Sequence, residues 1–144
     1  MFTHLIVHDN RLIRVAFSEF AKRHFLKNFE KKYRGRQWEV TVESILEDIG
    51  RIKMQGNKLE MTQQVDELWY KDGRWIFKYD FAVAQTRKSA KSSGNRCVVF
   101  LDSNCNEAEI LVIYHKDDLP KNMGEQAWIK STLINTFSDK MLLF

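Results

Sequence analysis

Residues 68–84 read LWYKDGRWIFKYDFAVA, and this stretch carries a strong hairpin signal. An Asp-Gly pair at positions 72 and 73 separates two aromatic-rich runs, which is the strongest short signal of a tight β-hairpin. One face of the second run is entirely aromatic and is predicted to be core: Trp75, Phe77, Tyr79 and Phe81. The opposite face is half polar and is a candidate lining for a cleft: Ile76, Lys78, Asp80 and Ala82.

A second pair of strands is predicted downstream. RCVVFLD (96–102) and EAEILVIYHK (107–116) are apolar runs on either side of the turn-like segment SNCN. Because the two arms have nearly equal lengths, a hairpin here brings Arg96 opposite the end of the last strand. We therefore expect residues 87–96 and 114–116 to be neighbours.

Helices are predicted on both sides of these strands. A short strand over 11–18 precedes Ser18, a suitable N-cap for a helix that continues to about residue 32. After Gly35 comes the clearest helical stripe of the chain, with apolar residues three, four and seven positions apart: Trp38, Val42, Ile45, Leu46, Ile49 and Ile52. Residues 124–137 predict an amphipathic closing helix.

The element order predicts an α+β protein with helices packed largely on one side of the sheet. We expect an antiparallel sheet of about four strands, with the 19–53 helical hairpin on one face and a C-terminal helix. The 144 residues fit a single domain, with a core over 11–119 and a helical extension over 120–144.

Composition narrows the functional class. The net charge is +4, and 44% of the residues are hydrophobic, so a folded domain with an anionic partner is favoured. No apolar run reaches a membrane-spanning length, and a soluble, cytoplasmic protein is expected. His4 and His8 have helical ligand spacing but no third ligand nearby, and no metal or cofactor is predicted. Cys97 and Cys105 are expected to be free thiols.

The most one-sided charge run is RKSAKSSGNR at residues 87–96. Its four cations, with no acid among them, suggest a loop that faces a polyanion: Arg87, Lys88, Lys91 and Arg96. A solvated surface loop is the alternative interpretation. Arg96 can also simply pair with a carboxylate, and His115 can be a partly buried, hydrogen-bonded histidine.

The segment SSGNRCVVFLDSNCNEAEILVIYHKDD, together with the element order, resembles the RelE/ParE superfamily of bacterial toxin–antitoxin toxins. Ser92, Ser93, Gly94 and Arg96 match the family's turn and its arginine, and IYHK matches the end of its final strand. The chain lacks the tail tyrosine on which some members rely, and Asp117 and Asp118 follow the matched strand end.

In its RelE branch this resemblance implies metal-independent cleavage of mRNA, generally in the ribosome, by attack of a ribose 2′-hydroxyl on the adjacent phosphate. It implies that Arg96 and Lys116 stabilise the phosphate charge, and His115 is the nearby group suited to proton transfer at neutral pH. Lys88 and Lys91, with Arg87 and Lys78 as outer candidates, would hold the RNA backbone. By spacing, Arg87 or Lys88 corresponds to the family's lysines; by strand register, Lys78 does.

Two other functions stay open. A toxin of the ParE type would inhibit a topoisomerase without cleaving RNA, and a basic-faced interaction domain would bind an acidic protein. In the toxin interpretation the expected partners are mRNA, the ribosome and a small cognate antitoxin, with no membrane involved.

Overall fold

A computed structural model describes residues 13–60 and 62–144. Its main sheet has five strands in the order β1-β7-β6-β5-β4. These strands are β1 (Arg14–Phe17), β4 (Val65–Lys71), β5 (Arg74–Phe81), β6 (Asn95–Asp102) and β7 (Glu107–His115). A separate two-stranded ribbon is formed by β2 (Met54–Gln55) and β3 (Lys58–Leu59).

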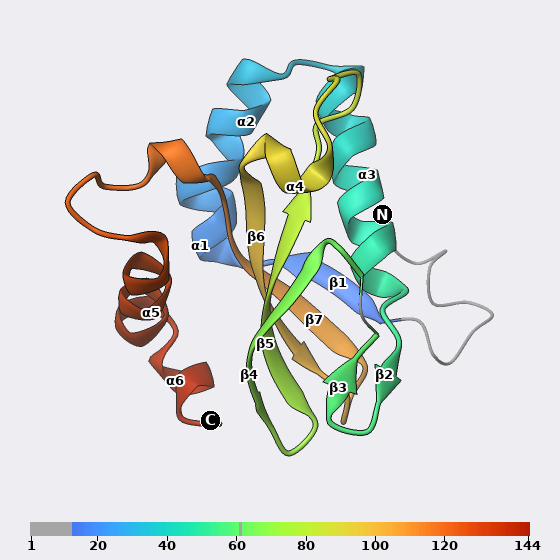
Figure 1. Cartoon of the computed structure of the whole chain (residues 1–144), viewed down its shortest axis with the longest axis vertical. Coiled ribbons are helices and arrows are strands. Elements are labelled where there is room, and N and C mark those ends of the chain that lie inside the picture. The colour runs from blue at the N-terminus through green and yellow to red at the C-terminus, as the bar shows by residue number, and fades with distance from the viewer. Residues whose placement is uncertain (1–12, 61) are drawn as a thin grey trace.

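The helices lie between β1 and β2, between β5 and β6, and after β7 (Figure 1). α1 (Glu19–Ala21), a π-helical segment (Lys22–Leu26) and α2 (Lys27–Lys32) are consecutive, and α3 (Arg36–Gly50) returns antiparallel to them. The later helices are α4 (Ala90–Ser93), a 3₁₀ turn (Lys116–Asp118), α5 (Glu125–Thr136) and α6 (Ser138–Met141). No helix in the described ranges is long and apolar enough to cross a membrane.

Both predicted hairpins are present. The β4–β5 turn has positive φ at Asp72 (52°) and Gly73 (81°), the two left-handed residues that a type I′ turn requires. β6 and β7 are antiparallel, with Arg96 opposite Tyr114 and Asn95 opposite His115. The predicted N-cap is also confirmed, because Ser18 Oγ accepts a hydrogen bond from Ala21 N at 2.9 Å.

The sheet is mixed, which corrects the expected antiparallel sheet of about four strands. β1 pairs with β7 in parallel, from Arg14 opposite Glu107 to Phe17 opposite Ile110. Alternation in a strand identifies its buried face but carries no information about the direction of its neighbour. The long crossover through the helices and the other strands allows this parallel pairing.

Helices cover both faces of the sheet, rather than largely one. The predicted aromatic face of β5 packs with α2 and α3 in a first core, which includes Trp38, Ile45, Ile49, Trp75, Phe77 and Phe81. α5 covers the other face in a second core, which includes Ile76, Val98, Phe100, Val112, Ile129 and Leu133. A sheet with two apolar faces needs a cover on each, and α5 supplies the second.

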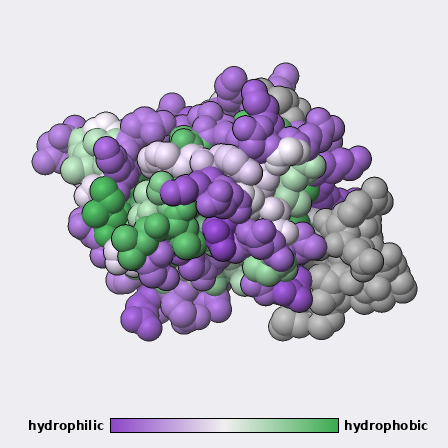
Figure 2. Space-filling view, turned by 90° about the horizontal axis from the view of Figure 1, so that it is seen from below, coloured by the Kyte–Doolittle hydropathy of each residue, from purple (hydrophilic) through white to green (hydrophobic). Residues whose placement is uncertain are grey.

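The two ends of the molecule differ in surface character. Figure 2 looks at the end that holds the β4–β5 turn, where an apolar cluster lies on the side of α5 and α6. Exposed large apolar residues in these helices and just after them include Ile134, Leu142 and Leu143. The basic loop between β5 and β6 lies at the opposite end, at the top of Figure 1.

Candidate nucleic-acid interface

The loop that joins β5 to β6 is fastened to the fold at both of its ends. Near its start, Ala84 accepts a hydrogen bond from Gln37 Nε2 (2.8 Å) and donates one to Thr41 Oγ1 (2.9 Å), so α3 holds the chain there. Near its end, Ser93 Oγ donates to the carbonyl of Phe81 at 2.6 Å and accepts from Asn95 N at 3.0 Å. The loop therefore presents its side chains from a fixed backbone.

Gly94 closes the loop against the end of β7. Its φ is +81°, and a Cβ there would lie 2.8 Å from His115 Nε2. The nitrogen of Lys116 donates to the carbonyl of Gly94 at 2.9 Å. Residues 93–95 and 115–116 are thus direct neighbours, as the hairpin geometry predicts.

His115 is hydrogen-bonded through both ring nitrogens. Asp117 N donates to Nδ1 at 3.0 Å, so Nδ1 is an acceptor, and Nε2 lies 2.9 Å from the carbonyl of Ser93. This arrangement assigns the proton of a neutral imidazole to Nε2, which donates to Ser93. In this conformation His115 ties the loop to the strand end, and its catalytic role stays a prediction.

The cations of the loop are directed to solvent. Arg87, Lys88 and Lys91 are exposed, and none of them has an ion-pair partner within residues 13–60 and 62–144. Lys116, which begins the 3₁₀ turn, is also exposed. These four cations, with the fixed loop that carries most of them, form one positively charged surface.

Sequence reasoning missed further cations at the same end. The α2–α3 connection lies beside the loop in Figure 1, and α3 holds the loop through Gln37. Lys31, Lys32 and Arg34 are exposed there. The run EKKYRGR at 30–36 was the available signal, and it is nearly as basic as the loop. We call Lys31, Lys32, Arg34, Arg87, Lys88, Lys91 and Lys116 together the basic end.

Arg96 does not belong to this exposed surface. Its side chain points to the α5 face of the sheet, is only 16% exposed, and pairs with two carboxylates. Nε lies 3.2 Å from Asp80 Oδ1, and Nη1 donates to Glu125 Oε1. Tyr114 completes the cluster by donating to Glu125 Oε2 at 2.7 Å. The alternative expectation from the sequence, that Arg96 simply pairs with a carboxylate, is therefore what the structure shows.

The titration of this cluster follows from burial and hydrogen bonding. Burial alone would raise the pKa of Glu125, but hydrogen bonds from Arg96 and Tyr114 outweigh it and lower the pKa. Burial raises the pKa of Asp80 more than the charges of Arg96 and Lys78 lower it. Asp80 Oδ1 is buried and makes no hydrogen bond in the described part of the chain, which fits its weaker stabilisation.

Lys78 lies on the same face as Arg96. Its side chain is 13% exposed, and Nζ is 3.8 Å from Asp66 Oδ2. The structure thus separates the predicted site residues into two groups. Arg87, Lys88, Lys91, His115 and Lys116 gather at the end of the sheet, whereas Arg96 and Lys78 lie under α5 among carboxylates.

Among the described residues, no group of three or more His, Cys, Asp or Glu side chains is arranged to hold a metal ion. His4 and His8 lie outside the described residues. Cys97 is buried and Cys105 is exposed, and both are free. Comparison of the chain with protein-family models, with curated proteins and with solved structures found no match.

Proposed function

We propose that the protein binds single-stranded RNA through the basic end and, as a toxin of the RelE type, cleaves mRNA bound to the ribosome. The observation that carries the proposal is a set of three exposed cations, Arg87, Lys88 and Lys91, on a loop that is anchored at both ends. None of the three pairs with a carboxylate of the described residues. Such cations attract a phosphate backbone and lose little side-chain pairing when they bind it.

Other features support the toxin class. The order of β1, the helical hairpin, the antiparallel strands β4–β7 and the closing helix agrees with the element order on which the RelE resemblance rests. The loop also meets the end of the last strand at Gly94, where His115 and Lys116 stand. A cation and an imidazole beside a phosphate-binding loop are the groups that 2′-hydroxyl attack requires.

Within this proposal Lys116 stabilises charge on the scissile phosphate. His115 takes the proton of the attacking 2′-hydroxyl and, once protonated, gives a proton to the leaving 5′-oxygen. His115 would first exchange one of its two present hydrogen bonds, either to Ser93 or to Asp117. Arg96 is reassigned as a positioning residue, because Asp80 and Glu125 already hold its guanidinium. A small antitoxin with an acidic segment would be complementary to the basic end.

The proposal is tested by induced expression in a bacterial host, with transcript 5′ ends mapped and translation monitored. We expect growth arrest with cut messages for the wild type, and a cleavage rate lowered by about 10²-fold for Lys116→Ala if its ammonium acts as a transition-state donor. The matched control is Lys130→Ala, which removes an exposed cation from α5. Harmless wild-type expression, or equal cleavage by both variants, would contradict the catalytic proposal.

A second function, binding without cleavage, is favoured by the pairing of Arg96 with two carboxylates, because the arginine that matches the family's phosphate ligand is occupied. A ParE-type inhibitor would arrest growth with intact messages and damaged DNA. The same expression experiment separates the two functions, since it records messages and chromosomal DNA together.

A further inference from the structure

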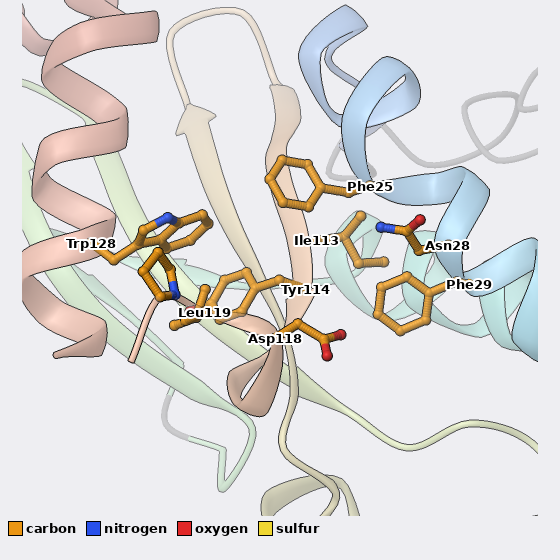
Figure 3. Close-up of a pocket in the computed structure, with 9 residues that line it drawn as sticks. Phe25, Asn28, Phe29, Ile113, Tyr114, Asp118, Leu119 and Trp128 are labelled. Carbon is orange, nitrogen blue, oxygen red and sulfur yellow. The ribbon is translucent and has the colours of Figure 1, made fainter. Parts of the chain in front are cut away.

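We infer that a pocket between the helical hairpin and the last helix receives one unstacked base of a single-stranded RNA. This inference rests on the proposed RNA binding and adds a base-binding site to it. The pocket has a volume of about 220 Å³ and is lined by residues of five segments (Figure 3): Phe25, Asn28, Phe29, Ile113, Tyr114, Asp118, Leu119, Pro120 and Trp128.

The pocket exists because β1 is short. β1 pairs with β7 only as far as Ile110. Just beyond this pairing, the Oγ of Ser18 donates a hydrogen bond to the carbonyl of Leu111. From Val112 on, this side of β7 has no strand neighbour among the described residues. Helices stand on either side of it instead, and the gap between their side chains is the pocket.

Its walls suit a flat ring. Phe25 and Phe29 stand on one side, Leu119 and Trp128 on the other, and Tyr114 forms part of the floor (Figure 3). Pockets for drug-sized molecules measure roughly 300–1,000 Å³, so this smaller one fits a single ring system better than a complete nucleotide. Bases splayed out of single-stranded RNA are typically held against aromatic side chains in this way.

Two polar side chains at the pocket supply hydrogen-bonding groups for a base edge. Asn28, from α2, offers both an amide donor and a carbonyl acceptor, and Asp118 offers acceptors. Both residues are exposed, and neither has a hydrogen-bond or ion-pair partner for its side chain in the part of the chain that the structure describes. They are therefore available to a ligand without loss of an internal contact.

The charges around the pocket favour a base over a cationic ligand. Aromatic rings with one carboxylate can also hold an ammonium group. Here exposed groups of both signs adjoin the lining residues: the cations Lys27, Lys31, Lys116 and Lys121, and the acids Glu30 and Asp117 beside the lining Asp118. Because the cations slightly outnumber the acids, and Lys31 and Lys116 belong to the basic end, the phosphates on either side of a neutral base are held better here than an ammonium group.

The test uses short single-stranded RNA with 2-aminopurine at one position, and the same RNA with an abasic residue there. We expect 2-aminopurine fluorescence to be quenched on binding and the abasic RNA to bind about tenfold more weakly, since stacking of one base on aromatic side chains contributes that much or more. Asn28→Ala should weaken binding of intact RNA about fivefold while leaving abasic RNA unaffected. Asp118→Asn removes a negative charge and should strengthen phosphate binding of both RNAs, so its effect on the base is measured by the ratio of intact to abasic affinity, which should fall about fivefold.

Matched controls are Asn135→Ala and Asp139→Asn, which remove the same groups from exposed positions on α5 and α6. If intact and abasic RNA bind equally tightly and the pocket variants leave the ratio of the two affinities unchanged, the pocket inference fails while RNA binding stands. If neither RNA binds, the proposed function itself fails. Competition by tetramethylammonium, with no effect of the abasic residue, would instead identify a cation pocket and overturn the inference.

Discussion

At position 94, two constraints require a glycine. The backbone φ of +81° lies in the left-handed region, and a Cβ would meet the imidazole of His115. The sequence predicted a turn here and predicted that the turn meets the strand end. It could not predict that His115 bonds to Ser93, or that Arg96 bonds to Glu125, because such contacts join residues far apart along the chain. They depend on side-chain directions that only the folded backbone sets.

Replacement of this glycine should destabilise the fold. For Gly94→Ala we expect a loss of about 1–2 kcal/mol from the left-handed φ and about 1–3 kcal/mol more from displacement of the imidazole. Gly56→Ala is the matched control, since Gly56 has a φ of +62° with nothing within 4 Å of the added Cβ. Urea unfolding measures the free energy of unfolding of both variants. Equal losses for Gly94→Ala and Gly56→Ala would show that the contact with His115 contributes nothing.

Among the helices and strands, those with strong local signals in the sequence were predictable. The Asp-Gly turn and the aromatic alternation of β5 define the β4–β5 hairpin, and the stripe from Trp38 onward defines α3. The direction of β1 and the placement of α5 were not predictable in the same way. The direction of β1 depends on how it pairs with β7, and the placement of α5 depends on which apolar face the rest of the molecule leaves uncovered. Local periodicity contains neither piece of information.

The attachment of α5 to the sheet gives a prediction at this scale. Glu125 is the first residue of α5 and binds Arg96 and Tyr114. The pKa of Glu125 is lowered from the ordinary value of 4.5. The stability that its ionised carboxylate gives to the folded state is therefore complete above pH 4.5 and is lost as the pH falls through the lowered pKa. Glu125→Gln should lower the free energy of unfolding by about 1–2 kcal/mol at pH 7. The difference from the wild type should shrink as the solution is acidified.

The measurement is the free energy of unfolding between pH 7 and pH 3 for the wild type and the variant. Glu43→Gln is the control, because this carboxylate is 66% exposed and lies 4.0 Å from the guanidinium of Arg36. A difference between the wild type and Glu125→Gln that does not change with pH would mean that the ionised carboxylate does not hold α5.

The whole molecule has a basic end and an opposite end with an apolar cluster over α5 and α6 (Figure 2). The distribution of charge along the sequence pointed to the basic loop, and the fold adds the α2–α3 connection to the same surface. In the folded protein, Arg96 and Lys78 lie away from that surface, on the α5 face of the sheet. The proposed RNA binding therefore depends on the position of the cations more than on the net charge of +4.

The salt dependence of single-stranded RNA binding shows whether the basic end is the RNA interface. The triple variant Arg87→Gln, Lys88→Gln, Lys91→Gln should lower the slope of log affinity against log salt by about 2, since each phosphate contact contributes about 0.7. The control triple, Lys53→Gln, Lys58→Gln, Lys71→Gln, makes the same charge change at exposed positions near the ribbon and the β4–β5 turn. We predict that the control keeps the wild-type slope; equal slopes for the two triples would contradict an RNA interface at the basic end.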